Sequence, residues 1–196
     1  MTDYTMHFEQ TEKTETFSVK KISFALPAIN RLDAAKEKSI CLFLFEEKKP
    51  IKGISGLVDW RLLGLVSKHI INGFITGKKN EAVLFHPGQR LPQTHVFILG
   101  LGSRDNFNHD QFCSAIDKML NVLSDLKCNS VITSLPGRTE NICKNTDAIL
   151  WFLDHLNNNL SKIPADLRFT IVEPKQNHSV MIPVVERWRM KHSLLI

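Results

Sequence analysis

The sequence predicts an α/β fold, a single three-layer domain with a central mixed, largely parallel sheet flanked by helices. Residues 40–45 (ICLFLF) form a continuous apolar run between charged neighbours, which is typical of a strand covered on both faces. Three more strand-like runs, at 96–101, 130–135 and 168–172, alternate with two long amphipathic helical patterns. Because right-handed crossovers make the strands of such a pattern parallel, we expect a largely parallel sheet.

Length and composition indicate one ordinary globular domain. The chain has 196 residues, of which 43% are hydrophobic and 23% charged, and a net charge of +5. We expect the domain to cover residues 17–196, after an N-terminal extension or edge strand at 1–16. No apolar run reaches the roughly 18–20 residues that span a bilayer, and the N-terminus has neither the cationic start nor the apolar core of a secretory signal. These features predict a cytoplasmic protein with no membrane partner.

Two alternating patterns near the N-terminus predict strands. Tyr4, Met6 and Phe8 alternate with polar residues, which favours a short edge strand over an unstructured tail. Residues 17–26 alternate as well, but the lysine pair at 20–21 shifts the phase between the two halves. We therefore predict one strand with a break or bulge at that pair.

The segment from residue 57 to residue 86 predicts a helix followed by a hairpin. Apolar residues recur every three or four positions between 57 and 71, which describes one amphipathic helix that continues through Gly64. Residues 73–86 then predict two strands joined by a tight turn at 77–80, because glycine and asparagine tolerate the positive φ that hairpins require.

Two long helices are predicted in the second half of the chain. The first has its apolar face within 112–126, and Asn108 and Gln111 precede it at the spacing of a capping box. The second has its apolar face within 142–160, with Thr139 as a candidate N-cap.

A glycine-rich turn follows the strand at 96–101, in the stretch VFILGLGSR. A dinucleotide-binding fingerprint needs a third glycine where this chain has Asp105. A P-loop needs a Gly-Lys-Ser/Thr sequence, and none follows. Neither nucleotide-binding motif is therefore present in this stretch.

Two turns nevertheless predict an anion site. Open α/β sheets bind ligands outside the carboxyl ends of their strands, and a second turn, Leu135–Arg138, ends the next strand along the chain. The same glycines would also allow a tight strand exit without any ligand, and this alternative stays open. The candidate cofactor-binding residues are Gly100, Gly102, Ser103, Arg104, Gly137 and Arg138.

No residue pattern predicts catalysis or a metal site. The four cysteines never form a C-x-x-C pair, the eight histidines form no H-E-x-x-H, and there is no G-x-S-x-G nucleophile elbow. We therefore name no catalytic residue, no metal ligand and no cofactor. We expect the cysteines to be reduced structural thiols.

Residues 183–192 form an amphipathic pattern that predicts a terminal helix. Arg187, Arg189 and Lys191 surround Trp188 in the sequence, a combination that can contact nucleic acid or a partner helix. A solvated helix face with Trp188 docked on the core explains the pattern more simply, so we expect no nucleic-acid partner.

Residues 56–138 resemble the N-terminal domain of the leucyl aminopeptidase (cytosol aminopeptidase) family, and the resemblance extends over about 17–174. Each landmark alone is weak, but their order is fairly specific. The landmarks are a helix ending near Gly73, the hairpin at 74–78, an apolar strand at 82–85, the Gly-Leu-Gly turn at 100–102, a long helix, and a strand that closes on Leu135-Pro136.

This resemblance implies a mixed sheet of the type also found in macro domains, which bind ADP-ribose. In the family, the domain precedes a separate metal-dependent catalytic domain, whose motifs are absent from this chain, so no catalytic residue can be carried over. Residues 145–148 (NTDA) coincide with the start of the family's metal-binding signature NTDAEGR. Ile149, Leu150 and Trp151 follow instead, and we interpret the match as chance.

Two functions are compatible with the resemblance. The first is a non-catalytic, stand-alone relative that acts as an assembly or regulatory module, with another protein chain or a second copy as its partner. The second is a macro-domain-type binding module for ADP-ribose or another phosphorylated small molecule. Fold analogy alone does not decide between them.

Overall fold

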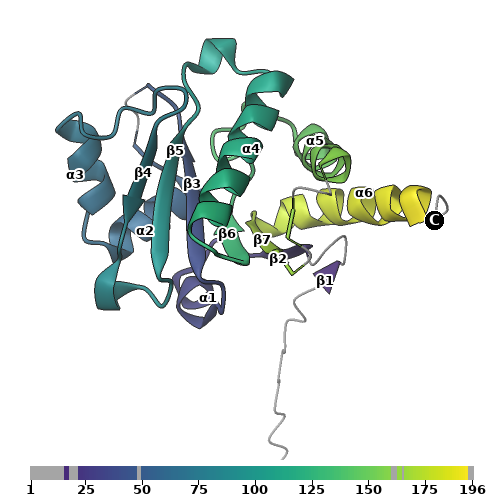
Figure 1. Ribbon diagram of the computed structural model, residues 1–196, viewed down its shortest axis with the longest axis horizontal. Coiled ribbons are helices and arrows are strands. Elements are labelled where there is room, and N and C mark those ends of the chain that lie inside the picture. Colours follow the sequence, from purple (N-terminus) through teal and green to yellow (C-terminus); the bar gives the residue numbers. More distant parts are fainter. Residues whose placement is uncertain (1–15, 18–21, 48–49, 160–162, 165, 194–196) are drawn as a thin grey trace, which may run out of the picture.

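A central sheet organises the part of the chain that the computed structural model describes, which is residues 16–17, 22–47, 50–159, 163–164 and 166–193. Within these residues the sheet has seven strands in the order β1-β2-β7-β6-β3-β5-β4 (Figure 1). Neighbouring strands from β2 to β5 are parallel, whereas β1 and β4, at the two edges, are antiparallel to their neighbours. The strands are β1 (Thr16–Phe17), β2 (Ile22–Ala25), β3 (Ser39–Leu44), β4 (Ala82–Phe85), β5 (His95–Gly100), β6 (Ser130–Thr133) and β7 (Arg168–Val172).

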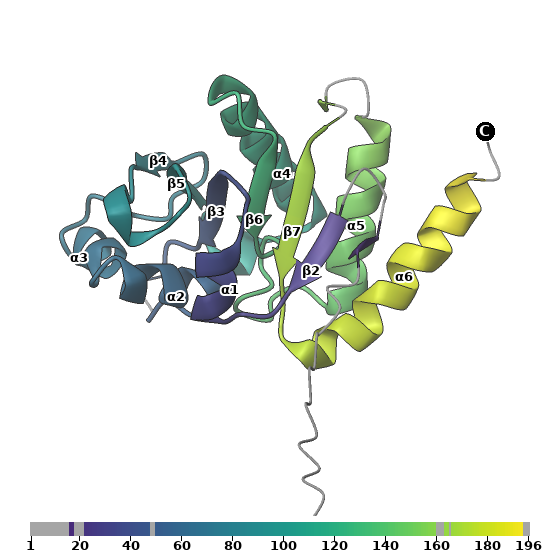
Figure 2. The same ribbon diagram turned by 90° about the horizontal axis from the view of Figure 1, so that it is seen from below.

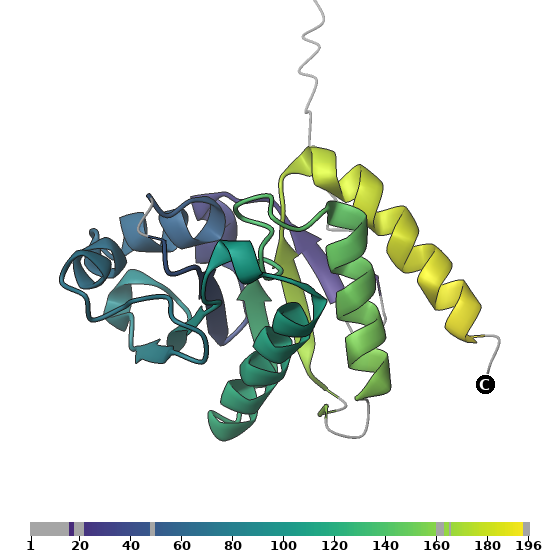
Figure 3. The ribbon, with the colours of Figure 1, turned by 90° about the horizontal axis from the view of Figure 1, so that it is seen from above.

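Helices cover both faces of the sheet, so the domain has three layers. α1, α2 and α3 pack on one face in an apolar cluster with the inward side chains of β3 and β5. α4, α5 and α6 share a second cluster on the other face. The three views agree that α3 and α6 lie at opposite ends of the molecule (Figures 1, 2 and 3). The helices are α1 (Ile29–Ala34), α2 (Gly53–Arg61), α3 (Leu65–Ile71), α4 (His109–Asp125), α5 (Asn145–Asn158) and α6 (Lys175–Ser193), with short 3₁₀ turns η1 (Gly88–Arg90) and η2 (Arg104–Asn106).

The predicted fold class is confirmed. Every residue of β3 is buried, and β3 lies between β6 and β5, as expected for a strand that is apolar along its whole length. β5, β6 and β7 all run parallel to β3. Although β5 and β6 are consecutive in the predicted βαβ pattern, β3 separates them in the sheet.

The single strand predicted over 17–26 is wrong. Thr16 pairs with Ser23 and Phe17 with Ile22, so β1 and β2 form an antiparallel pair. The segment therefore contains parts of two strands, β1 and β2, and the lysine pair at 20–21 lies outside the described residues. The strand predicted from Tyr4, Met6 and Phe8 lies outside the described residues.

The helix predicted over 57–71 is two helices. Leu63 and Gly64, between α2 and α3, have φ values of 56° and 76°, which no α-helix can accommodate. The hairpin predicted for 73–86 is also wrong, since only its second strand, β4, forms. The N–H groups of Thr76 and Gly77 donate to the carboxylate of Glu81 instead of to a partner strand.

The long helices follow the prediction more closely, apart from their starts. Asn108 caps α4 by accepting a hydrogen bond from the N–H of Gln111 at 3.1 Å. Thr139 does not cap α5, because its hydroxyl bonds to that of Ser134 and the helix begins only at Asn145. α6 starts at Lys175, ahead of the predicted 183–192. The prediction missed this start because the first turn of the helix is polar and shows no apolar periodicity.

Candidate functional site

The turn after β5, which holds the first half of the predicted anion site, uses its backbone donors within the chain. The N–H of Gly100 donates to Glu81 O, that of Leu101 to Leu44 O, and that of Gly102 to Gly77 O, at distances of 2.8–2.9 Å. Phosphate-binding turns hold their ligand through free backbone N–H groups. These three donors are therefore already used to join the turn to its neighbours.

Two further donors of this turn hold a carboxylate, that of Glu47, which lies three residues after the end of β3. Glu47 Oε1 accepts from the N–H of Arg104 at 2.9 Å and from the Ser103 hydroxyl at 3.2 Å. Desolvation alone would raise the pKa of Glu47. This desolvation effect is outweighed by four groups that favour the carboxylate: the N–H groups of Arg104 and of Glu47 itself, the Ser103 hydroxyl and the Arg104 charge. The pKa of Glu47 therefore lies below its ordinary value of 4.5. The turn thus binds an anion, and that anion is a side chain of the same protein.

Arg104 joins the two predicted turns. Its guanidinium lies 3.5 Å from Glu47 Oε2, forms an ion pair with Glu140, and stands over the ring of Phe45. Glu140 lies two residues after the Leu135–Arg138 turn in the chain. The two turns therefore do lie side by side, as predicted, and the arginine of the first is enclosed between two carboxylates.

Arg138, in the second turn, points into the protein. Its side chain is 4% exposed, and its Nε and Nη2 donate to the two carboxylate oxygens of Glu173, at 3.1 and 3.3 Å. Nη1 donates to the carbonyl of Cys143 at 2.5 Å. A buried, two-point pair of this kind fixes the ends of β6 and β7 relative to each other.

The glycines of the predicted site are required by close packing and by backbone conformation. A Cβ on Gly100 would lie 2.0 Å from Lys78 O, and a Cβ on Gly137 would lie 2.7 Å from the ring of Phe107. Gly102 has a φ of 78°, which side chains other than glycine rarely adopt. These contacts support the tight strand exit that the sequence left open. Binding of an external anion by the six predicted residues stays a prediction.

The cysteines are free, and three of the four, Cys41, Cys128 and Cys143, are buried. Burial, and to a lesser extent the charge of Asp147, raises the pKa of Cys143 to about 11. Burial likewise raises the pKa of the Cys41 thiol well above its usual range. Protonated thiols of this kind are poor nucleophiles at neutral pH.

Within the described ranges, no three His, Cys, Asp or Glu side chains are arranged to hold a metal ion. No helix in that part of the chain combines the length and the apolar character needed to cross a membrane.

Sequence reasoning missed the carboxylates that complete these turns. Glu173 follows β7 directly and Glu47 lies three residues after the end of β3, so the signal was an acidic residue shortly after a buried strand. Groups that attract anions at the carboxyl ends of strands predict a ligand site, but a carboxylate of the chain itself satisfies them equally well.

A second surface, at the end of the molecule formed by α2, α3 and the turns that follow them, was also missed. Nine large apolar side chains are exposed within the described part of the chain, and five of them lie between residues 60 and 84. Each of the five side chains is more than half exposed. A single exposed apolar residue is common on protein surfaces, but several in one short segment call for an explanation. Leu84 points to the opposite face of the sheet, because Val83 and Phe85 on either side of it pack with the cluster under α1, α2 and α3. We call the surface of the other four the apolar end; its members are Trp60, Leu63, Ile71 and Phe74.

The fold is that of a macrodomain. A macrodomain of Oceanobacillus iheyensis is similar over 90% of this chain and 98% of its own, with a TM-score of 0.67 and 10% identity. A Trypanosoma brucei macrodomain solved in complex with ADP covers 85% of this chain and 69% of its own, with a TM-score of 0.65 and 12% identity. At such low identity, the likeness concerns the fold alone.

The family is more specific. The model of the cytosol aminopeptidase family, N-terminal domain, matches residues 41–156, more than half of the chain, and the protein belongs to this family. A tomato leucine aminopeptidase shares the fold over 83% of this chain and 35% of its own, with a TM-score of 0.52 and 12% identity. These findings confirm the resemblance inferred from the order of the sequence landmarks.

Curated relatives agree over the same region. A probable cytosol aminopeptidase of Cupriavidus pinatubonensis is 24% identical over 119 residues, which is 61% of this chain and 23% of that protein. One of Burkholderia cenocepacia is 25% identical over 119 residues. The match thus spans less than a quarter of the length of these relatives.

Proposed function

We propose that this domain is a non-catalytic assembly or regulatory module of the cytosol aminopeptidase family, which works by binding another protein chain through its apolar end. The observation that carries the proposal is the exposure of four large apolar side chains within fifteen residues, on α2, on α3 and in the turns that follow each helix: Trp60, Leu63, Ile71 and Phe74. Clustered exposed apolar side chains mark sites of protein contact. We place this activity in the cytoplasm, in accord with the free thiols of the chain.

The hydrogen bonds that the two strand-end turns make within the protein support this proposal over ADP-ribose binding. A phosphorylated ligand needs free donors, but the Arg104 N–H and the Ser103 hydroxyl bind Glu47, and Arg138 binds Glu173. An incoming phosphate would have to displace carboxylates that are linked to the fold. The binding module for ADP-ribose therefore remains the second hypothesis.

Site-specific photo-crosslinking in the source cells tests the assembly role. A benzophenone amino acid replaces Phe74 at the apolar end or, as a control, the exposed Leu150 on α5 at a different part of the surface. We expect one discrete crosslinked protein from position 74 and none from position 150. Identical adducts from both positions, or none from either, would contradict the proposal.

The non-catalytic part of the proposal has its own test. The purified chain is incubated with a leucine anilide substrate in the presence of added manganese or zinc. We expect no release of leucine. Release that stays proportional to the chain's concentration through purification would show that the chain is an enzyme.

A further inference from the structure

We propose that the pocket between the α2–α3 corner and η1 binds an acidic peptide segment of a partner protein, in which a carboxylate lies next to a large apolar side chain. This inference rests on the proposed function and names the chemistry of the partner. It is carried by the lining of the pocket, by the conformation of Leu63 and by the charges that face the pocket.

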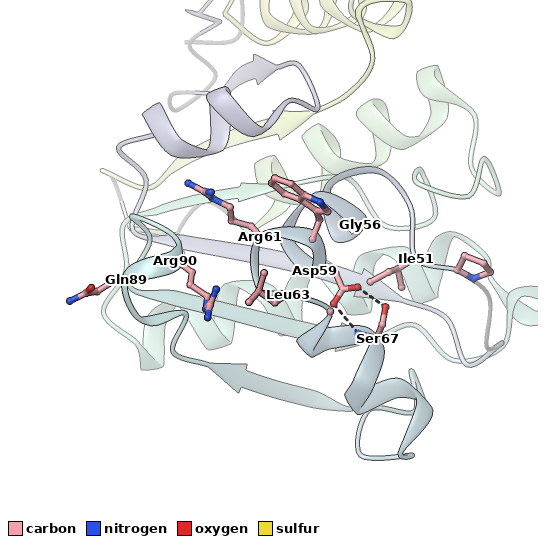
Figure 4. Close-up of a pocket in the computed structure, with 11 residues that line it drawn as sticks. Ile51, Gly56, Asp59, Arg61, Leu63, Ser67, Gln89 and Arg90 are labelled. Carbon is pink, nitrogen blue, oxygen red and sulfur yellow. Dashed lines mark hydrogen bonds between the residues drawn. The ribbon is translucent and has the colours of Figure 1, made fainter.

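The pocket has a volume of about 770 Å³ and combines apolar walls with cations. Ile51, Trp60 and Leu63 supply apolar surface, and Arg61 and Arg90 supply guanidinium groups. Figure 4 shows both arginines beside Leu63, with Asp59 and Ser67 bonded to each other on its other side. Such a site can enclose one apolar side chain while a cation pairs with a neighbouring carboxylate.

Four hydrogen bonds hold the corner that forms this pocket. The N–H of Leu63 donates to Trp60 O and that of Gly64 to Asp59 O, the paired bonds that close a helix at its C-terminus. The buried carboxylate of Asp59 then accepts from the N–H and the hydroxyl of Ser67, at 3.0 and 2.6 Å, which fixes the first turn of α3. A fixed corner loses little conformational freedom when a partner binds.

Leu63 is held exposed at a conformational cost. Its φ of 56° is the left-handed conformation that glycine usually supplies at this position, and its side chain is 73% exposed. The fold gains little burial from this leucine and would be better served by glycine. Strain that the fold does not require is a recognised mark of a binding site.

Charge identifies the partner as acidic. The lining of the pocket holds two arginines, Arg61 and Arg90, and one carboxylate, Asp59, which already accepts two hydrogen bonds from Ser67. Arg61 pairs with Asp33 of α1, whereas the guanidinium of exposed Arg90 has no partner among the described residues. A second copy would bring the same positive surface, so like charges disfavour it.

Selection of random peptides displayed on phage against the full-length protein tests the inference. We expect enriched peptides to carry Asp or Glu beside Leu, Ile, Phe or Trp. A synthetic peptide of the enriched sequence should bind about tenfold more weakly to Arg90→Glu. Replacing its carboxylate residue by Lys should restore binding to that variant. Leu63→Gly should also weaken binding, although the fold tolerates glycine there.

Arg189→Glu is the matched control, because Arg189 is exposed on α6 at the far end of the molecule and the charge change is the same. It should leave peptide binding unchanged. The inference is wrong if acidic peptides are not enriched, or if both variants weaken binding equally. It is also wrong if Arg90→Glu instead abolishes self-association or binding to single-stranded DNA. A crosslink at position 74 without peptide binding would refute this inference and leave the assembly role standing.

Discussion

Two arginines, predicted alike from their position after glycine, have different surroundings. Arg104 remains partly exposed between Glu47 and Glu140, whereas Arg138 is buried against Glu173. The sequence predicted that their turns would be adjacent, because parallel strands end at the same edge. It could not predict their direction, which depends on which carboxylate each guanidinium can reach.

Replacing Arg138 by Met should destabilise the protein by about 3–5 kcal/mol, because Glu173 would stay buried without its cation. The double variant Arg138→Met/Glu173→Met should lose much less, since it leaves no uncompensated charge. Urea unfolding of both variants measures the difference. Equal losses would mean that the pair does not act as a unit.

Glu47→Gln should cost about 1 kcal/mol near neutral pH, a modest value because the side chain is partly exposed. The folded-state pKa of Glu47 lies below the ordinary 4.5, so its stabilising effect is present above that value and is lost as the pH falls through the folded pKa. Unfolding at a series of pH values should show wild type and variant converging in acid. A constant difference at all pH values would refute this role of Glu47.

At the scale of elements, patterns of apolar residues predicted which helices and strands exist better than where each begins and ends. Four elements begin and end within three residues of their expected positions, because each has a strong apolar period or run: β3, β5, β7 and α4. The break between α2 and α3 was missed because Leu62 and Val66 continue the helical period across it. The period says which residues face the core, but not whether the backbone between them stays helical.

Leu63→Gly should stabilise the fold by about 1 kcal/mol, because glycine adopts the left-handed conformation without the clash of a Cβ. Gly64→Ala is the converse control. A Cβ at Gly64 meets nothing within 4 Å, so its expected loss of about 1–2 kcal/mol is conformational alone. Thermal unfolding compares the two variants. A destabilised Leu63→Gly would show that the leucine side chain contributes to the fold.

At the scale of the whole molecule, the family resemblance predicted the macrodomain-like sheet, but no local pattern predicted the strand order. β3 inserts between β5 and β6, although it precedes both in the chain. The apolar end was equally hidden, because exposure depends on what packs nearby. Trp60 and Leu63 are as apolar as their buried neighbours Val58 and Leu62, and only the tertiary structure separates them.

Isothermal titration calorimetry of ADP-ribose into the full chain tests most directly the central claim, that groups of the protein itself, the carboxylates of Glu47 and Glu173 among them, accept from the donors described in the strand-end turns. We predict no saturable heat. A saturable heat in the wild type that disappears in Ser103→Ala would contradict the account, because it would show that an external phosphate reaches the donors assigned to Glu47.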